Sequence, residues 1–267
     1  LGVIGRLETF DRLNNSININ DKTIWFHCAS LGEYEQGFPL FVELKKKYPN
    51  HKLILSFFSP SGYEVKKTKS IADVVVYLPM DTNHNCKKFL DLINPELVVF
   101  VKSEIWPNYL NEIKKRNIKS ILICAIYNTS QMKYSLLKKA VLKFDYIFTQ
   151  DEKSKDLFKS IGHNNVFNSG DTRFDRVSMS KNLNEDVDYI KEFLSEKDCL
   201  IAGSTWGKDH EILTSYINHS KSDLKYIIAP HEINNEEINN LKSFINKKTV
   251  LFSELNNENI KTASVII

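Results

Sequence analysis

The sequence predicts an α/β protein built from two Rossmann-like domains, and three observations lead to this fold class. Short runs rich in β-branched and aromatic residues alternate with stretches of helical period from residue 24 onward. Several of these runs, such as residues 97–101, are apolar throughout, which is typical of strands buried on both faces of a parallel sheet. The alternation breaks off between residues 171 and 184, where apolar residues are few, and then begins again.

The first series of elements predicts the larger domain. Strands are expected at residues 23–28, 52–57, 74–78, 97–101, 120–125, 146–149 and 166–168. Amphipathic helices are expected at residues 36–48, 83–93, 107–116, 134–144 and 153–161. Strand and helix alternating at this spacing predict a parallel sheet with helices on both faces.

The second series is shorter. Helices are expected at residues 186–194, 209–217 and 235–245, and strands at residues 199–202, 224–228 and 249–252. We therefore place the domain boundary near residue 178, which gives domains of residues 1–177 and 178–267. The first residues resemble neither an initiator segment nor a signal peptide, and the chain stops in an apolar run, so both ends are expected to be cuts through a longer protein and the second domain is expected to be incomplete.

The composition narrows the class of protein. With 267 residues, 42% of them hydrophobic and 26% charged, the chain is typical of a folded protein and is long enough for two domains or for one large one. A formal net charge of +3 is too small to indicate nucleic acid as a partner. No run of about 18 apolar residues is present that could span a bilayer. The four cysteines lack the paired spacing of a zinc site and are expected to be buried thiols, which favours a cytoplasmic compartment.

The turns that follow the strands are the candidate sites, because ligands of doubly wound sheets bind at the carboxyl ends of strands. The first turn carries Ser30 and Gly32, followed by the acids Glu33 and Glu35. Acids favour the first turn of a helix, and capping accounts for Glu35. For Glu33, capping and catalysis have equal support, because a carboxylate at the mouth of a cleft could accept a proton from a hydroxyl group.

A second turn follows the most apolar strand. It contains Lys102, Ser103 and Glu104, and Pro107 is placed to begin the next helix. Charged groups next to a buried strand need partners. A structural ion pair and a contact with a ligand explain this turn equally well.

Two turns of the second series have features of an anion site. Residues 203–205, Gly-Ser-Thr, join a strand to a helix and offer hydroxyl groups at a helix N-terminus, where phosphate can bind. Residues 230–232, Pro-His-Glu, close the next strand in the same way. Near the domain boundary, the guanidinium of Arg173 could bind phosphate or carboxylate.

Two other patterns have simpler explanations. Asp186 and Asp188 have the spacing of a metal-binding acid pair, but they open a polar helix, where capping explains them. A basic amphipathic helix is expected to be either a surface helix packed on the sheet or one attracted to anionic lipid headgroups. Its lysines are Lys133, Lys138, Lys139 and Lys143.

Several segments, taken together and in order, resemble one enzyme family. They are HCASLGEYEQGFPL (27–40), FFSPSGYEV (57–65), VVYLPMD (75–81), ELVVFVKSEIWPNYL (96–110), GDTRFDRV (170–177), IAGSTWGKDHEIL (201–213) and IAPHEI (228–233). From about residue 5 to its end, the chain resembles the lipopolysaccharide Kdo transferases, the 3-deoxy-D-manno-octulosonic acid transferases.

The resemblance implies a GT-B fold, in which two Rossmann-like domains face a cleft. It implies that the first domain binds the acceptor and the second binds the donor CMP-Kdo. Glu33 matches the glutamate that acts as the family's catalytic base. The acceptor-side residues implied are Ser30, Gly32, Ser103 and Glu104. The donor-binding residues implied are Arg173, Gly203, Ser204, Thr205, Pro230, His231 and Glu232.

The resemblance also implies the reaction and its setting. An inverting transferase would move Kdo from CMP-Kdo to a lipid A precursor in lipopolysaccharide core biosynthesis, with no metal ion and no cofactor. Its partners would be CMP-Kdo, the lipid A precursor and an anionic membrane surface, at the cytoplasmic face of the bacterial inner membrane. The family's membrane-inserted segment matches no part of this chain.

Two other functions agree with the residues. One is another GT-B nucleotide-sugar enzyme, either a transferase with a different donor or an epimerase, and the nucleobase that it binds would distinguish it. The other is a non-catalytic two-lobed binding protein, against which the Glu33 turn and the lack of a signal peptide argue.

Overall fold

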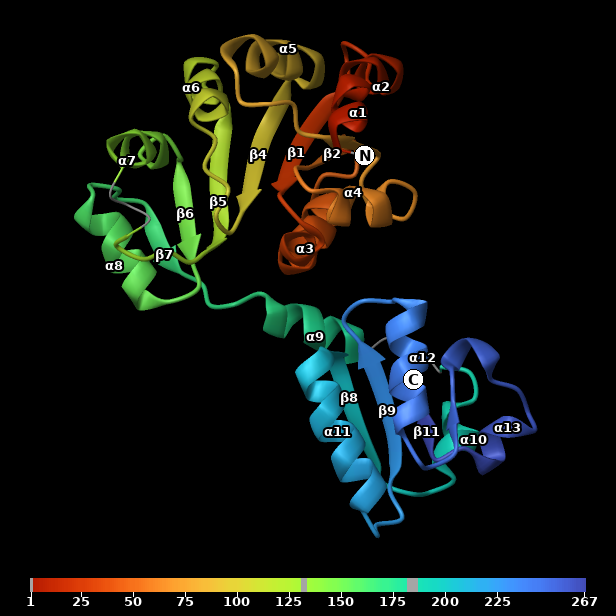
Figure 1. Cartoon of the computed structure of the whole chain (residues 1–267). Helices are drawn as coiled ribbons and strands as arrows, with labels where there is room; N and C mark the ends of the chain where they lie inside the picture. Colours follow the sequence, from red (N-terminus) through yellow and green to blue (C-terminus); the bar gives the residue numbers. More distant parts are fainter. Residues whose placement is uncertain (1, 131–133, 182–186) are drawn as a thin grey trace. The chain divides into compact units, whose positions relative to one another are not determined.

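The structure is a computed structural model that describes residues 2–130, 134–181 and 187–267 (Figure 1). It divides into two compact units, Leu1–Leu183 and Asn184–Ile267, each with a parallel sheet. The boundary expected near residue 178 falls inside helix α9 (Arg173–Lys181), which packs on α3 (Leu31–Lys47). The first unit therefore extends a few residues beyond the expected boundary.

Seven parallel strands form the sheet of the first unit, in the order β3-β2-β1-β4-β5-β6-β7. They are β1 (Lys22–Cys28), β2 (His51–Phe57), β3 (Val74–Tyr77), β4 (Pro95–Val101), β5 (Lys119–Ala125), β6 (Tyr146–Thr149) and β7 (Val166–Asn168). All seven strands were expected. The first six have the Rossmann order, in which the sheet grows outward in both directions from β1 and β4.

Helices cover both faces of this sheet. Helices α3 and α4 (Pro60–Lys66) lie on one face, over a core that includes Phe26, Phe41 and Phe57. The core on the other face includes Trp25, Phe89 and Phe100. The helices that contribute to it are α2 (Thr9–Ser16), α5 (Asn83–Ile93), α6 (Pro107–Lys115), α7 (Ser135–Val141) and α8 (Glu152–Ser160).

Some helices of the first unit differ from expectation. Helices α1 (Gly2–Leu7), α2, α4 and α9 were not predicted, because each has only six to nine residues, and a helical period is hard to recognise over so short a stretch. Helix α3 begins at Leu31, five residues before the expected start, because extended Ser30 caps it directly after β1. Helix α6 begins at Pro107, as predicted.

The second unit has four parallel strands in the order β10-β11-β9-β8. The strands are β8 (Cys199–Thr205), β9 (Lys225–Pro230), β10 (Thr249–Val250) and β11 (Val265–Ile266). The helices are α10 (Ile190–Leu194), α11 (Gly207–His219), α12 (Asn235–Phe244) and α13 (Asn259–Thr262), with a 3₁₀ turn, η2 (Phe252–Glu254). Helices α11 and α12 cover one face, and α10 and α13 cover the other.

Three predictions for this unit need correction. Strand β8 runs to Thr205 instead of ending at residue 202, so residues 203–205 belong to the strand and not to a loop. The strand expected at residues 249–252 is only two residues long, and β11 was not expected. Among the described residues, no helix is both long enough and apolar enough to cross a bilayer.

Candidate active site

The site of the first unit lies at the topological switch point of its sheet, where the strand order reverses between β1 and β4. Strands β1 and β4 are parallel neighbours, although the chain forms β2 and β3 between them. In doubly wound sheets the crevice for a ligand opens at the carboxyl ends of two such strands. The predicted catalytic residue and the predicted acceptor-side residues lie here: Glu33 with Ser30 and Gly32 after β1, and Ser103 and Glu104 after β4.

Glu33 occupies the third position of α3, one turn from the N-cap Ser30. Its Oε2 accepts a hydrogen bond from the backbone N–H of Ala29 at 2.5 Å, and the side chain is largely buried. The bond is similar to half of a capping box, except that the N–H group belongs to Ala29, the residue before the N-cap Ser30. Capping and catalysis therefore do not exclude one another at Glu33, since one oxygen caps and the carboxylate remains at the strand end.

The environment of Glu33 suits a base. Burial raises the pKa of Glu33 to about 7, and the negative charge of Glu104 contributes to the rise. The Ala29 N–H and the cation of Lys102 oppose this rise in the pKa. A general base works best with a pKa near the operating pH, and a carboxylate with a pKa near 7 meets that condition at neutral pH.

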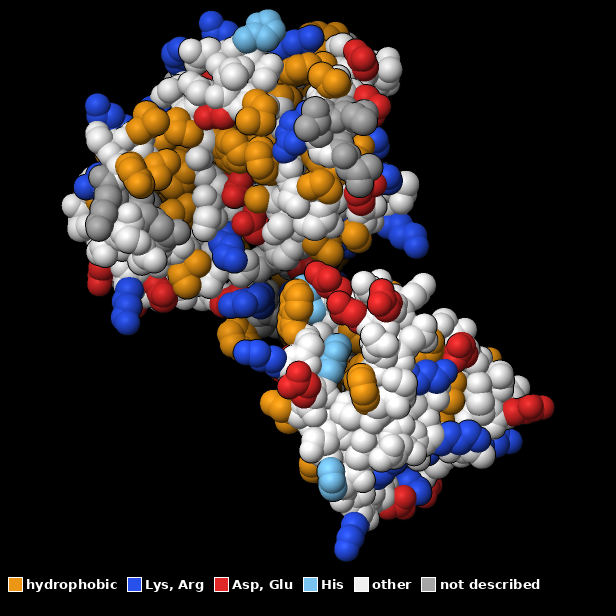
Figure 2. Space-filling view, viewed as in Figure 1, with side chains coloured by type: hydrophobic (Ala, Val, Ile, Leu, Met, Phe, Trp, Pro, Cys, Tyr) orange, Lys and Arg blue, Asp and Glu red, His pale blue; other side chains and the backbone are white. Residues whose placement is uncertain are grey.

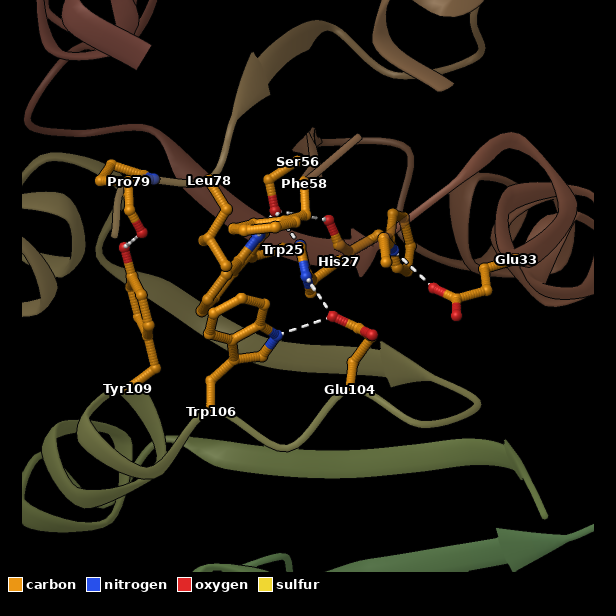
Figure 3. A network of polar contacts seen from close by, with 12 residues as sticks. Trp25, His27, Glu33, Ser56, Phe58, Leu78, Pro79, Glu104, Trp106 and Tyr109 are labelled. Carbon is orange, nitrogen blue, oxygen red and sulfur yellow. Dashed lines mark hydrogen bonds and ion pairs between the residues drawn. The ribbon is translucent and has the colours of Figure 1, made fainter. Parts of the chain in front are cut away.

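Glu104 is held by two N–H groups on one of its oxygens (Figure 3). His27 Nε2 lies 2.9 Å from Glu104 Oε2, and Trp106 Nε1 donates to the same atom at 2.8 Å. The side chain of Glu104 is 12% exposed. The sequence left a structural ion pair and a ligand contact open for this turn, and the structure pairs Glu104 with an imidazole and an indole.

Behind Glu104, a chain of polar side chains enters the core. His27 Nδ1 lies 2.8 Å from Ser56 Oγ, and Trp25 Nε1 donates to the same hydroxyl at 2.8 Å. All three side chains have no exposed surface. Sequence analysis missed these residues. The signal that could have found them is the pair of polar residues, His27 and Ser56, within the segments 24–28 and 53–57, whose other residues are apolar.

A third strand end contributes Tyr127, which the sequence did not indicate. Its buried hydroxyl has no hydrogen-bond partner that meets geometric criteria among the described residues. Burial raises the pKa of Tyr127 strongly, and the charges of Glu104 and Glu33 add to the rise while Ser103 opposes it. The Tyr127 hydroxyl is therefore neutral, and it lies close enough to Glu104 and Glu33 for their charges to act on it.

Lys102 turns the chain from β4 into this site. Its φ is +66°, in the left-handed region that non-glycine residues rarely adopt, and its N–H donates to Ile123 O at 2.8 Å. Residues in such conformations are often found at functional sites, where the surrounding structure holds them in place.

Glu35 corrects a prediction. It is the fifth residue of α3 and caps nothing. Its carboxylate binds Lys66 Nζ of α4 at 3.1 Å and Arg176 Nε of α9 at 2.7 Å, so one side chain joins three helices. The guanidinium of Arg176 also lies over the ring of Phe38.

Arg173 has an exposed side chain at the start of α9. Its guanidinium binds the carboxylate of Asp171, with Nη2 2.5 Å and Nε 2.8 Å from Oδ2. No hydrogen bond or ion pair within the described part of the chain joins it to Glu33 or Glu104. A ligand that uses Arg173 would have to share it with Asp171.

In the second unit, the predicted donor residues gather at the ends of β8 and β9. Ser204 has a φ of +59°, and the pairing of β8 with β9 shifts at this residue. Such a bulge re-aims a side chain, and Ser204 Oγ lies 2.8 Å from His231 Nδ1. His231 stacks on Trp206, with ring centroids 4.3 Å apart. A methyl group at Gly203 would meet no atom within 4 Å, so the strand end is open on that side.

A groove of about 810 Å³ lies beside these residues, between α11 and α12. Thr205, Pro230 and Glu232, three of the predicted donor residues, line it. Thr205 Oγ1 lies 2.9 Å from His210 Nε2, which lines the same groove. No group of three or more His, Cys, Asp and Glu side chains in the described ranges is placed to hold a metal ion.

The fold defines a class of protein. A UDP-GlcNAc 2-epimerase from Neisseria meningitidis, solved with UDP-GlcNAc, matches 92% of this chain and 71% of its own with a TM-score of 0.59 at 14% identity. A putative UDP-N-acetylglucosamine 2-epimerase from Listeria monocytogenes matches 85% of this chain and 67% of its own with a TM-score of 0.59 at 9% identity. These likenesses concern the fold alone, which is the GT-B fold of nucleotide-sugar transferases and epimerases.

Sequence comparison shows the family. A family model described as 3-deoxy-D-manno-octulosonic-acid transferase (kdotransferase) matches residues 5–176. The 3-deoxy-D-manno-octulosonic acid transferase of Aquifex aeolicus is 30% identical over 80% of this chain and 56% of its own length. A bifunctional glycosyltransferase/methyltransferase of Fusobacterium nucleatum is 29% identical over 94% of this chain and 42% of its own length. The chain belongs to the Kdo transferase family, and it spans about half the length of the curated relatives it matches.

Proposed function

We propose that the protein is an inverting glycosyltransferase that moves Kdo from CMP-Kdo to a lipid A precursor in lipopolysaccharide core biosynthesis, without a metal ion. Membership of the Kdo transferase family supports the sugar and the reaction class. The observation that carries the proposal is Glu33, a carboxylate at the switch point of the sheet with a pKa raised to about 7.

In this mechanism Glu33 accepts the proton of the acceptor hydroxyl. The hydroxyl oxygen forms a bond to the anomeric carbon of Kdo, the bond from that carbon to the CMP phosphate breaks, and the electron pair leaves with the phosphate. A hydroxyl pKa lies far above 7, so the base helps only as the new bond develops. Glu104 keeps Glu33 basic enough to take the proton at neutral pH.

The donor would bind with its phosphate at the ends of β8 and β9. The hydroxyl groups of Ser204 and Thr205 and the N-terminus of α11 can stabilise charge that develops on the departing phosphate. His231 is within hydrogen-bond distance of Ser204, so the two can act on one ligand group. Arg173 would contribute a cation. The cleft between the two domains, which the sequence leads us to expect, stays a prediction.

The acceptor and the membrane belong to the same proposal. Lys138 and Lys139 of α7 have exposed side chains, as have Tyr134 and Leu136 beside them, which suits a surface that meets anionic lipid headgroups at the cytoplasmic face of the inner membrane. Lys133, which was expected in the same helix, lies outside the described residues, as does Asp186 of the acid pair.

Two measurements test the proposal. Titration calorimetry with CMP, UMP and GMP should show preferential binding of CMP, whereas a preference for UMP or GMP would favour a different nucleotide-sugar enzyme. Incubation with CMP-Kdo carrying radiolabelled Kdo and a lipid A precursor should then transfer label to the lipid. Binding of CMP without transfer would leave only the non-catalytic binding protein.

A further inference from the structure

The buried chain Trp25–Ser56–His27–Glu104 has a definite direction. An indole N–H can only donate, so Ser56 Oγ accepts from Trp25. The hydroxyl hydrogen of Ser56 then has two acceptors within reach, His27 Nδ1 at 2.8 Å and Phe26 O at 3.4 Å. The Glu104 carboxylate can only accept, so in the neutral imidazole Nε2 carries the hydrogen and donates it to Glu104. Nδ1 is then the acceptor for the Ser56 hydroxyl.

Packing fixes the imidazole ring in this orientation. The ring of His27 meets Phe100 and Trp106 edge-on, with centroids 5.8 Å and 5.6 Å away. It has no exposed surface, so no solvent competes for either ring nitrogen. Such a fully satisfied buried network is rigid, and a partly satisfied one is costly. The position of the Glu104 carboxylate is thus determined from inside the sheet.

We propose that Trp25, Ser56 and His27 are positioning residues that hold the Glu104 carboxylate beside Glu33 and thereby set the proton affinity of Glu33. The inference rests on the proposed role of Glu33 as the base. Apolar side chains of similar volume could fill the same space in the core, so stability alone does not explain these polar residues. Positioning Glu104 gives them a function.

Of the titratable groups that face Glu33, Glu104 is the one whose charge raises the pKa of Glu33. On β4 and the turn after it these are Glu104 and Lys102, on β1 Cys28, and after β5 Tyr127. Burial raises the pKa of the Cys28 thiol and of the Tyr127 hydroxyl far above 7, so both stay neutral. Lys102 lowers the pKa of Glu33. Among these groups, only the Glu104 carboxylate raises the pKa of Glu33 through its charge.

Two substitutions of His27 separate the loss of the hydrogen bond to Glu104 from the loss of the imidazole ring itself. In His27→Gln, the amide N–H₂ can reach the place of Nε2 and donate to Glu104. In His27→Asn, the shorter amide reaches only the place of Nδ1, and Glu104 loses one of its two donors. We expect the pKa of Glu33 to fall by about one unit in His27→Asn, which is about a tenfold change in proton affinity. In His27→Gln it should stay near the wild-type value.

Ser56→Ala is the milder companion variant. Without the hydroxyl, His27 Nδ1 and the Trp25 N–H both lose their partner, so the imidazole is held less firmly and its Nε2–H bond to Glu104 is weakened. Glu104 is then held less firmly beside Glu33, so the pKa of Glu33 should fall, by less than in His27→Asn. Because this variant removes a single oxygen atom, it keeps the test open if His27→Asn does not fold.

The experiment is a ¹³C NMR titration of glutamate side-chain carboxyls in the wild-type protein and the three variants. The Glu33 resonance is assigned by its loss in Glu33→Gln, and circular dichroism checks folding. A lower midpoint in His27→Asn and Ser56→Ala, with recovery in His27→Gln, supports the proposal. Equal midpoints in wild type and Ser56→Ala overturn it.

This readout does not depend on turnover. If the wild-type protein transfers no Kdo, the proposed function fails while the titration still tests the positioning chain. If transfer occurs, its acid limb should move to lower pH in His27→Asn and the maximal rate should fall by up to about tenfold, because a base with a lower pKa is weaker. A uniform loss of rate with an unmoved acid limb contradicts the proposal.

Discussion

The two strand-end sites of the protein differ in how far solvent reaches them. In the first unit Glu33 is 9% exposed and His27 is 0% exposed. In the second unit Ser204 and His231 are exposed, and Figure 2 shows histidine side chains open to solvent on the visible face of this unit. Burial raises the pKa of a carboxylic acid because it disfavours the charged form, whereas exposed side chains are accessible to a ligand from solvent. The first site is thus suited to move a proton and the second to recognise a ligand.

The two sites share one backbone feature, a left-handed residue at the end of a strand. A non-glycine residue with positive φ stands at the end of a strand in each unit, Lys102 at +66° and Ser204 at +59°. In the first unit the chain then leads to Glu104, whose partners are buried. In the second unit the turned residue itself presents a hydroxyl to His231 at the surface. The surroundings, rather than the turn, decide what each site can do.

The largest effect is expected from removing the base. Glu33→Gln should lower the rate of Kdo transfer about 10²–10⁴-fold, while CMP-Kdo binding measured by calorimetry stays unchanged. Because the glutamine oxygen can still accept the Ala29 N–H, the helix start should be retained. The matched control is Glu43→Gln, an exposed acid on the same helix that pairs only with Lys46 among the described residues. Near-normal transfer by Glu33→Gln would rule out Glu33 as the base.

The same variant should be more stable at alkaline pH. A pKa raised from 4.5 to about 7 means that the native state binds more protons than the unfolded state between those values, so stability falls as the pH rises through that window. Removing the ionisable group should remove up to about 3 kcal/mol of this penalty at pH 8 and nothing at pH 4. Chemical denaturation at both pH values measures the difference, and equal stability of variant and wild type at pH 8 would contradict the pKa.

A smaller effect is expected at the second site. Ser204→Ala removes the hydroxyl that meets His231 and should raise the KM for CMP-Kdo about fivefold, since a hydrogen bond contributes roughly 1 kcal/mol. The pH dependence of the rate should not change, because this exposed group tunes no base. Ser243→Ala, which loses only a local bond to Asn240 O, is the control. A shift of the pH profile in Ser204→Ala would contradict the division of tasks.

A still smaller effect is expected from Glu35, with the opposite dependence on pH from that of Glu33. Burial raises its pKa, but the hydrogen bonds from Arg176 and Lys66 outweigh burial and leave the pKa lowered. Its contribution is present above pH 4.5 and is lost as the pH falls through the native pKa. Glu35→Gln should cost less than about 1 kcal/mol at pH 7 and nothing at pH 2. A gain in stability at pH 7 would contradict the ion pairs.

No effect is expected from removing metal ions. Kdo transfer in excess EDTA should equal the untreated rate, since the proposed charge stabilisation comes from hydroxyls, Arg173 and a helix N-terminus. Loss of transfer that returns with added Mg²⁺ would contradict metal-independent transfer.

The sequence predicted the features that depend on neighbours along the chain. Glu33 and Glu104 could be found because each follows its strand directly, and the strand ends of a parallel sheet share one edge. Glu35 was misread because one of its partners, Arg176, lies 141 residues away. Helix α9 was missed because none of its residues is buried, so it lacks an apolar period. The chain of Trp25, Ser56 and His27 was not predicted, because its contacts form only when β1 pairs with β2.

That meeting of two strands has a consequence for how the chain folds. In the parallel pairing of β1 with β2, His27 stands opposite Ser56. A slip by one residue would set the imidazole opposite Leu55 or Phe57, with no hydroxyl at hand. A buried polar group without a partner costs about 1–3 kcal/mol, and Trp25 would lose the same hydroxyl. Because residues 24–26 and 53–55, which precede this pair in the two strands, are apolar and alike, the polar contact helps to distinguish the correct alignment from its neighbours. It is therefore expected to favour the native pairing over a misfolded one.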